Sequence, residues 1–380
     1  MIEFKLPSLG ADMDRGTLLE WRVQPGQAVK KGDVVAVVDT TKAAVDVEIW
    51  VDGTVHRLLA AVGQDLPVGT VMAELLAPGE SAPDAAAMSR AGAPAAPAAA
   101  PPRQVASPAA RRRAAELHLD LAGLAGSGAS GAITLEDVER AAALAAAPTP
   151  PETPPPPADR LADMRHAIAA AMSRSKQEIP HYYLAETVPM RKALDWLHEA
   201  NAQRPLAERL LPAALLLKAV ALAVRDFPEM NGWFVDGVFH PGAVAHIGVA
   251  IALRQGGLIA PALHDVGGRE LGAVMFGLAD LVRRCRAGRL RSSEMSDPTL
   301  TVTNLGDQGV EDVFGVIYPP QVALVGFGRI TERAWVQDGQ LVVMPVVRVS
   351  LSADHRVSDG HRGAMFLMRL AELLQQPDKL

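Results

Sequence analysis

Alternating apolar and polar residues, broken by glycines, run through the first 80 residues of the chain. Shifting the sequence by 37 positions, from Gly16 to Gly53, aligns the glycines of one half with those of the other: Gly26 with Gly63 and Gly32 with Gly69. Apolar positions between them repeat with the same offset. Two copies of one β-unit predict a small all-β sandwich with pseudo-twofold symmetry.

A hairpin lies where the two copies meet. Residues 34–38 (VVAVV) and 43–51 (AAVDVEIWV) have strand composition, and the polar residues 39–42 (DTTK) form the turn between them. We therefore expect Lys42 at a hairpin tip, away from any core. An isolated turn lysine is ordinarily only solvated, so its meaning depends on its context.

Two Ala- and Pro-rich stretches, 81–104 and 142–158, interrupt the apolar pattern. Neither can build a packed core, and Pro-rich chain favours extended polyproline II at about 3.1 Å per residue. They divide the chain into an N-terminal block (1–80), a central block (105–141) and a C-terminal block (159–380). An alanine run before the second stretch predicts that a helix continues into it.

The central block predicts two short helices around a Gly-rich loop. Ser107 is a candidate cap of the first helix, with Pro108 in its first turn, and Thr134 with Asp137 resembles a capping box for the second. Three consecutive arginines belong to the first helix, and such a run is usually a solvated face: Arg111, Arg112 and Arg113.

Helix and strand patterns alternate in the C-terminal block, which predicts an α/β domain. Residues 160–176 place Leu161, Met164, Ile168 and Met172 at helical spacing, and residues 210–227 form a largely apolar helix. Strand patterns occupy four segments: 246–253, 300–306, 321–330 and 341–352.

The last strand runs into the string LSADHRVSDG, residues 351–360. His355 falls at the end of this strand, and Asp359 is placed to cap or orient the helix that follows. A lone histidine at a strand end is more often structural, so only the longer string is specific. The inward side chains of the helix are expected at Ala364, Leu367, Met368 and 370–374.

Charge and cysteine content narrow the possible functions. A net charge of −6 and a pI near 5.9 give no basic face for nucleic acid or a membrane surface. One cysteine, Cys285, excludes a disulfide framework and a cysteine-cluster metal site. It has basic neighbours but no pairing base, so we expect no catalytic role. With neither a signal-peptide pattern nor an apolar run of about 18 residues, a cytoplasmic protein is expected.

A lysine at the middle turn of a twofold β-repeat, ahead of an Ala/Pro spacer, resembles the lipoyl and biotinyl carrier family. In that family an amide joins the cofactor to the lysine. Methionines flank the lysine in the biotinyl branch, whereas Thr41 and Ala43 flank Lys42 here. The resemblance therefore implies lipoate on Lys42.

The central block, lying between such a carrier and the C-terminal block, resembles the peripheral subunit-binding domain. The resemblance implies that Arg111, Arg112 and Arg113 dock on an acidic partner. LSADHRVSDG, together with TVTNLG (residues 301–306) and IYPPQVALVGFG (317–328), resembles the dihydrolipoamide acyltransferases of 2-oxoacid dehydrogenase complexes. These share the chloramphenicol acetyltransferase-like fold.

Acyl transfer between thiols needs a base and an oxyanion donor, which explains the residue types. A thiol pKa of about 8.5 and an imidazole pKa of about 6.5 let a neutral histidine take the proton near pH 7. His355 is the expected base, and by resemblance Thr303 is the oxyanion donor, with Asn304 lining the site. Asp359 is expected to hold backbone or an arginine, and Thr299 and Thr301 can simply belong to a polar strand face.

The resemblance further implies a homotrimer whose active sites lie between subunits, and coenzyme A as substrate. Family cores build cubic particles from trimers through an apolar C-terminal tail, whereas this sequence ends in the polar QQPDKL, so both a larger cubic core and isolated trimers stay open. The implied partners are a thiamine-dependent 2-oxoacid decarboxylase and lipoamide dehydrogenase. Acetyl is the expected acyl group on frequency alone. Two alternatives stay open: a scaffold component without catalysis, and a biotin-carrier subunit, which the residues beside Lys42 oppose.

Overall fold

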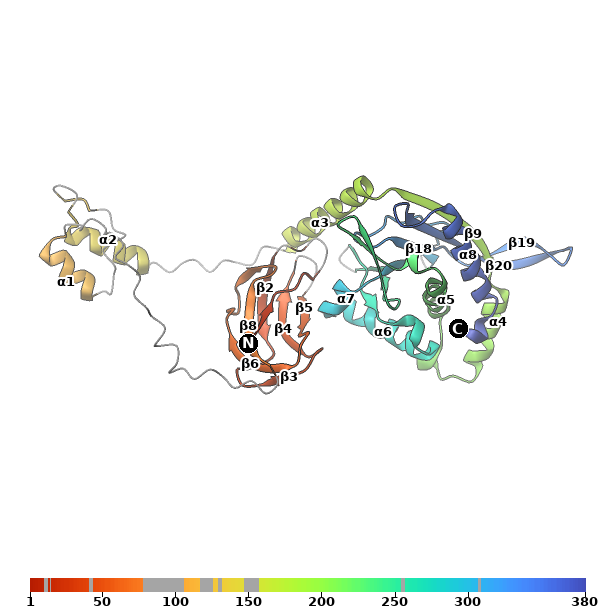
Figure 1. The fold of residues 1–380 in the computed structure, drawn as a ribbon, viewed down its shortest axis with the longest axis horizontal. Coiled ribbons are helices and arrows are strands. Elements are labelled where there is room, and N and C mark those ends of the chain that lie inside the picture. Colours follow the sequence, from red (N-terminus) through yellow and green to blue (C-terminus); the bar gives the residue numbers. More distant parts are fainter. Residues whose placement is uncertain are drawn as a thin grey trace. The chain divides into compact units, whose positions relative to one another are not determined.

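The computed structural model describes residues 1–9, 13, 15–40, 44–77, 106–116, 126–128, 132–146, 157–253, 257–306 and 309–380, with the backbone alone at 115–116, 141–146, 157–161 and 163–164. Lys42 and the first predicted spacer, 81–104, lie outside these residues. The chain divides into two compact units, Met1–Ala82 with Pro156–Leu380 and Pro83–Pro155. The finer division into three blocks and two spacers stays a prediction, and each block is described by itself (Figure 1).

The N-terminal block is the predicted β-sandwich. One sheet has the order β1 (Ile2–Lys5), β8 (Val71–Leu76), β6 (Gly53–Leu58), β3 (Ala28–Val29). In the other, the strands of this block follow the order β5 (Ala44–Glu48), β4 (Val34–Asp39), β2 (Arg15–Trp21), β7 (Asp65–Pro67). Fully buried side chains from both sheets form one core, among them Leu18, Val38, Val47 and Met72. Asp39 pairs with Ala44 where β4 and β5 approach the predicted tip.

The 37-residue repeat is confirmed by the strand pairing. The copy of β4 is β8 and the copy of β3 is β7, and each copy lies in the opposite sheet, as a pseudo-twofold axis requires. The repeated turns also match, with φ of +88° and +85° at Gly26 and Gly63, and +94° and +86° at Gly32 and Gly69. Glycine adopts this left-handed backbone at little cost, which explains why the sequence repeats glycine at these turns.

The central block has two helices, α1 (Pro108–Glu116) and α2 (Leu135–Ala146). Both predicted caps are present: the Ala110 amide donates to Ser107 Oγ at 3.1 Å, and Thr134 and Asp137 exchange bonds. Amides of Ser127 and Thr134 hold the pKa of Asp137 well below its usual value. α2 continues to Ala146, into the predicted spacer 142–158. A small hydrophobic core holds the block together and consists of Ala106, Ala110, Ala114, Ile133 and Val138.

Arg111 and Arg112 are exposed on α1, and Arg113 is half-buried, 4.0 Å from a Glu139 oxygen. Their role in docking stays a prediction.

The C-terminal block is α/β, built on a mixed sheet in the order β15-β12-β17-β18-β20-β19, with β9 paired to β20. Its first half comprises α3 (Pro157–Glu178), β9 (His181–Pro189), α4 (Arg191–Ala202), η3 (Leu206–Glu208), α5 (Pro212–Asp226), η4 (Pro228–Met230), β10 (Gly232–Val235), β11 (Val238–Pro241), β12 (Ile247–Val249), β13 (Ile251–Ala252), β14 (Leu258–Ile259) and β15 (Ala262–Leu263). Its second half comprises η5 (Val266–Gly268), α6 (Leu271–Arg286), β16 (Leu290–Arg291), α7 (Ser292–Ser296), β17 (Leu300–Asn304), β18 (Ala323–Phe327), β19 (Thr331–Gln337), β20 (Gln340–Asp354), α8 (Gly360–Leu374) and η7 (Pro377–Lys379). All four predicted strand segments and all three predicted helices are present.

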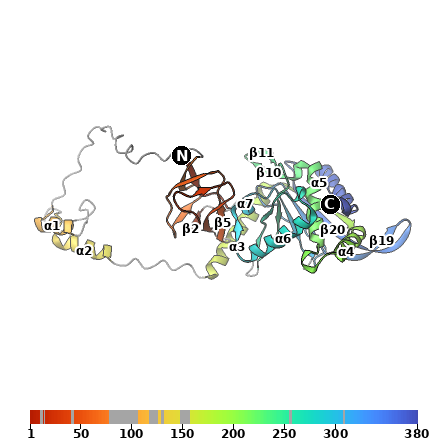
Figure 2. The ribbon, with the colours of Figure 1, turned by 90° about the horizontal axis from the view of Figure 1, so that it is seen from below.

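Helices α5 and α8 pack together, and α8 also covers β9 and β20 (Figure 1). The β19–β20 hairpin projects away from the rest of the block in both ribbon views (Figures 1 and 2). This arrangement leaves the end of β20 at the base of α8, where the sequence placed the candidate histidine.

One predicted helix face was partly wrong. On α8, Ala364 and Met368 are exposed, while Phe366 is fully buried against Phe227 of the segment after α5. The helix turns this face inward because Gly363 lets it approach β9 closely, a contact that periodicity alone does not reveal. The predicted helix over residues 160–176 is present as part of α3; among its described side chains, Ala171 and Ser175 are buried, and Ile168 and Met172 are half-buried.

Candidate active site

His355 lies directly after β20, and its side chain is exposed. Its backbone amide donates to the carbonyl of Pro180 at 3.0 Å, which ties the turn to the start of β9. The imidazole borders an open hollow of about 590 Å³ lined by Glu229, His355, Arg356, Val357, Ser358, Asp359 and Arg362. The sequence-predicted histidine therefore faces a space that a substrate can enter.

The residues on either side of His355 form an ion pair that the sequence analysis missed. Asp354 is fully buried, and its carboxylate accepts bonds from Arg356 Nε and Nη2, at 2.7 Å for the latter, and from the Arg356 amide. The guanidinium lies 4.1 Å from the centre of the Phe234 ring. A buried carboxylate with this many donors holds the turn that presents His355. The sequence does contain a signal for this pair: an aspartate and an arginine stand two positions apart at the end of the predicted strand.

Asp359 is the N-cap of α8, as expected. Its carboxylate accepts from the Arg362 amide at 2.9 Å, and this backbone hydrogen bond lowers the pKa of Asp359. The Arg362 side chain instead pairs with Glu229 and lies over the Phe227 ring. Asp359 thus fixes the start of the helix, and no hydrogen bond joins it to His355 among the described residues.

Thr303 lies near the end of β17 and is half-buried. Among the described residues, its hydroxyl has no hydrogen-bond partner. Asn304 is exposed, and its side-chain oxygen accepts from the Gly306 amide at 2.9 Å. Asn304 therefore shapes the turn after β17, next to a hydroxyl that is available to a substrate.

The other two threonines of this strand face are structural. Thr299 donates to Asn231 Oδ1 at 2.5 Å, and Thr301 donates to Gln321 Oε1 at 2.7 Å. Both are buried. The polar-face interpretation holds for these two positions.

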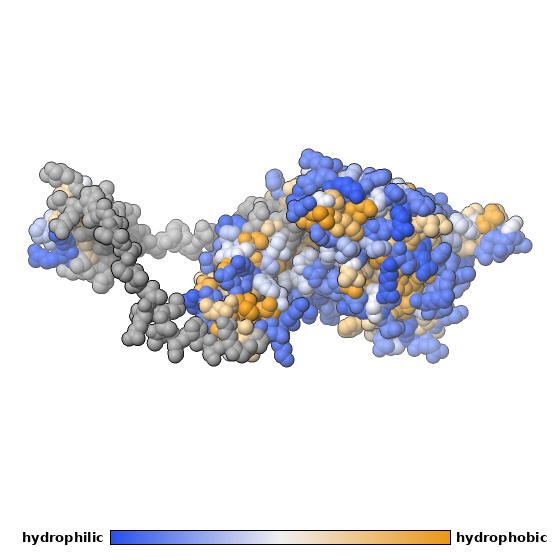
Figure 3. All heavy atoms as spheres, viewed as in Figure 1, coloured by the Kyte–Doolittle hydropathy of each residue, from blue (hydrophilic) through white to orange (hydrophobic). Residues whose placement is uncertain are grey.

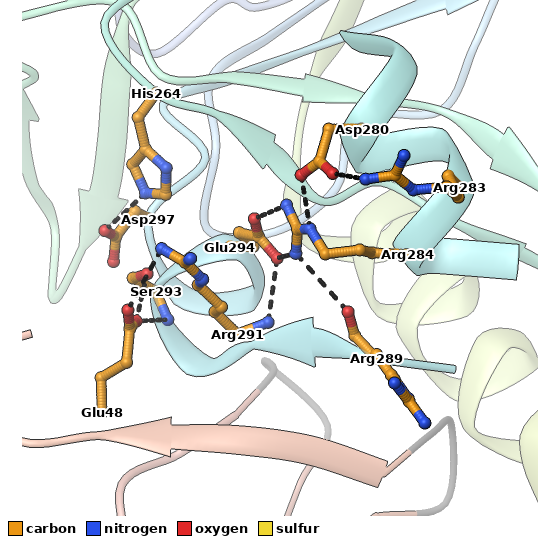
Figure 4. Close-up of polar contacts among 10 residues, drawn as sticks. All are labelled: Glu48, His264, Asp280, Arg283, Arg284, Arg289, Arg291, Ser293, Glu294 and Asp297. Atoms are coloured by element: carbon orange, nitrogen blue, oxygen red, sulfur yellow. Dashed lines mark hydrogen bonds and ion pairs between the residues drawn. The ribbon is translucent and has the colours of Figure 1, made fainter. Parts of the chain in front are cut away.

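A partly buried ion network precedes β17 (Figure 4). Arg284 bonds Asp280 Oδ2 and Glu294 Oε2, each at 2.7 Å, and these partners raise the pKa of the guanidinium. Glu294 also accepts the Arg291 amide at 2.9 Å. Because Arg284 and Asp280 lie on α6 and Glu294 lies on α7, these bonds anchor α6 to β16 and α7. They thereby hold the segment that leads into β17, the strand of Thr303.

Strand register keeps Thr303 and His355 apart within one chain. Thr303 pairs with Gly326 on β18, which pairs with Ser350 on β20. From Ser350 the strand runs four residues to Asp354, about 13 Å at about 3.3 Å per residue, and two strand spacings add about 10 Å sideways. The two candidate groups are thus too far apart to act on one carbonyl in the same chain.

Cys285 is buried on α6, and burial raises the pKa of its thiol to about 11. A thiol in this state is a poor nucleophile near neutral pH. Within the described part of the chain, no helix is long and apolar enough to cross a membrane. The same residues contain no cluster of three or more metal-ligating His, Cys, Asp or Glu side chains.

The blocks match three family models. The catalytic domain of the 2-oxoacid dehydrogenases acyltransferase matches residues 156–380, a biotin/lipoyl attachment model described as that of biotin-requiring enzymes matches residues 2–75, and an E3-binding domain matches residues 105–139. The chain belongs to the 2-oxoacid dehydrogenase acyltransferase family. It transfers an acyl group between a dihydrolipoyl group and coenzyme A, with lipoate as its bound cofactor.

Relatives and solved structures agree with this assignment. The acetyltransferase component of the pyruvate dehydrogenase complex from Zymomonas mobilis is 30% identical over 99% of this chain and 98% of its own. A probable dihydrolipoamide acetyltransferase from Listeria monocytogenes is 27% identical with a TM-score of 0.53, covering 60% of this chain and 94% of that one. The cubic core of a pyruvate dehydrogenase multienzyme complex is 26% identical with a TM-score of 0.53, covering 59% and 97%. The predicted fold class and enzyme class are confirmed.

Proposed function

We propose that this chain transfers acetyl groups between a dihydrolipoyl arm on Lys42 and coenzyme A, in a pyruvate dehydrogenase complex, with His355 as general base. The observation that carries the site assignment is the exposed His355 imidazole on the hollow after β20, held by the Asp354–Arg356 pair. His355 takes the proton of the attacking thiol as its sulfur bonds to the thioester carbonyl. When the tetrahedral intermediate collapses, the departing thiolate takes that proton back.

Thr303 donates a hydrogen bond to the oxyanion of this intermediate. Its hydroxyl has no hydrogen-bond partner among the described residues, which supports the role, since a donor already engaged elsewhere would have to break a bond first. Asp359 supports the site by capping α8, and Asn304 shapes its wall.

The separation of Thr303 from His355 supports an active site shared between two subunits, and hence a trimer. A second feature fits such a trimer: exposed apolar side chains on the β19–β20 hairpin, Val336, Leu341 and Val343, are 69%, 76% and 60% exposed (Figure 3). Apolar side chains gathered on a projecting hairpin suit contact with another copy of the chain. The solved cubic core supports the larger assembly as a further proposal.

The helical block supports two partners, the 2-oxoacid decarboxylase and lipoamide dehydrogenase, with Arg111, Arg112 and Arg113 as the docking side chains. Arg111 and Arg112 are exposed on α1, and their positive charges are compatible with an acidic partner surface. A single cysteine, which cannot form an intrachain disulfide, is compatible with a cytoplasmic location.

The acetyl assignment is tested with purified protein, free dihydrolipoamide, and acetyl-, isobutyryl- or succinyl-CoA. We expect acetyl-CoA to give the highest kcat/KM. A preference for isobutyryl- or succinyl-CoA would leave the acyltransferase assignment unchanged but would place the chain in a different 2-oxoacid dehydrogenase complex. No transfer from any donor by folded protein would favour the scaffold alternative.

Replacing Thr303 with valine should lower kcat by about 100-fold or more, because one oxyanion donor is lost at similar volume. Thr303→Ser keeps the hydroxyl and should stay within about tenfold of wild type. Steady-state kinetics with acetyl-CoA measures both. If the serine and valine variants are equally slow, the hydroxyl is not the donor.

A further inference from the structure

Tyr182 on β9 is the side chain that contacts the His355 imidazole. The two rings meet edge to face, with centroids 5.2 Å apart and an interplanar angle of 70°. Tyr182 pairs with Ala353 across β9 and β20, so the strand register places it beside the histidine that follows β20. The aromatic contact therefore follows from the sheet.

Two contacts hold the tyrosine in this position. Its hydroxyl lies 2.8 Å from Ser358 Oγ, on the turn between His355 and α8. Its ring lies against Gly363 of α8, where an added Cβ would come within 2.9 Å of the Tyr182 hydroxyl and ring edge. Ser358 also lies 3.8 Å from the Met230 sulfur. The tyrosine is thus fastened to the helix and to the turn that bear the site.

The histidine itself has little else to orient its ring. The His355 backbone amide donates to the Pro180 carbonyl, and among the described side chains none forms a hydrogen bond with the imidazole. An exposed side chain on a turn samples more than one rotamer unless a neighbour restricts it. Burial raises the pKa of Tyr182, so its hydroxyl stays protonated and keeps its bond with Ser358 at neutral pH.

We propose that the Tyr182–Ser358 pair is a positioning device that holds the His355 imidazole in the orientation needed to take the thiol proton. This inference rests on the proposed role of His355 as general base. It assigns Tyr182 no contact with the substrate: the pair acts through the histidine, by limiting its rotamers.

The test compares Tyr182→Phe, Ser358→Ala and the double variant in the full-length protein, with acetyl-CoA and free dihydrolipoamide. Each single variant should lower kcat about tenfold, the effect expected when one hydrogen bond that supports the transition state is lost. Both KM values should stay unchanged. The double variant should lose no more than either single variant, because both changes remove the same bond. Tyr182→Leu, which also removes the ring, should lose about 100-fold.

Tyr183→Phe is the matched control. It removes a hydroxyl from the next residue of the same strand, where Tyr183 bonds Lys176 and stacks near His181. We expect its kcat to stay within about twofold of wild type, compared with about tenfold for the loss of one hydrogen bond at Tyr182.

An unchanged kcat for Tyr182→Phe, additive losses in the double variant, or a change confined to KM would each overturn the inference. If Tyr182→Phe lowers the thermal midpoint or dissociates the assembly, Ser358→Ala decides, since it breaks the same bond and leaves the ring in place. If the His355→Ala variant keeps its activity, both the general-base assignment and the positioning role are wrong. An inactive His355→Ala beside a normal Tyr182→Phe removes only the positioning role.

Discussion

Replacing His355 with alanine is expected to lower kcat for transfer from acetyl-CoA to free dihydrolipoamide by about 10²- to 10⁴-fold, the usual contribution of a positioned general base. The change should leave the fold intact, because the imidazole is exposed and the turn is held by backbone bonds and the Asp354–Arg356 pair. Steady-state kinetics, with the thermal midpoint measured alongside, tests both statements.

His198→Ala is the control for this variant. His198 is an exposed histidine on α4, so its removal changes the histidine content without touching the hollow. The assignment fails if His355→Ala keeps more than a tenth of the wild-type kcat. It also fails if His198→Ala loses as much.

Replacing Lys42 with arginine is expected to abolish lipoylation and, with it, turnover of the assembled complex. Arginine keeps the positive charge but offers no amine that forms the lipoyl amide. Transfer to free dihydrolipoamide should persist at the wild-type rate, because the C-terminal block supplies the base and the oxyanion donor. The intact-protein mass shows whether lipoate is attached. Complex turnover and transfer to free dihydrolipoamide, assayed in parallel, separate the two expected outcomes.

Lys31→Arg is the matched control, an exposed lysine of the same block. It should keep both the lipoyl mass and complex turnover. Lipoate still present on the Lys42→Arg protein would move the attachment site to another lysine. The two variants also discriminate between functions: His355→Ala stops the transfer chemistry, and Lys42→Arg stops delivery of the acyl group to it.

The sequence predicted correctly the turns and helix caps, which are determined by residues close together along the chain. The repeated glycines forecast turns that share one left-handed backbone, and Ser107 and Asp359 forecast caps that form within three residues of themselves. The inward face of α8 was forecast less well. Its phase depends on the close approach of Gly363 to β9, and nothing local to the helix encodes that distance.

For the site, the string LSADHRVSDG and its resemblance to the acyltransferases predicted His355 and Asp359, and the same resemblance added Thr303. Nothing in the sequence connects Tyr182 with Ser358, which are 176 positions apart. Their contact exists because nine residues of β9 pair in register with β20 and carry the tyrosine to the turn after it.

The amino-acid sequence by itself determined the β-repeat, the helical block, the α/β pattern and the chemical types of the catalytic side chains. These depend on spacings of two to four residues and on short motifs. Only the tertiary structure decided which groups meet. The long pairing of β9 with β20 sets Tyr182 against His355, and the register of β17, β18 and β20 keeps Thr303 about 13 Å along the strand direction from the end of β20. Such long-range register is fixed by the packing of the whole sheet, which is why it cannot be read from any one segment.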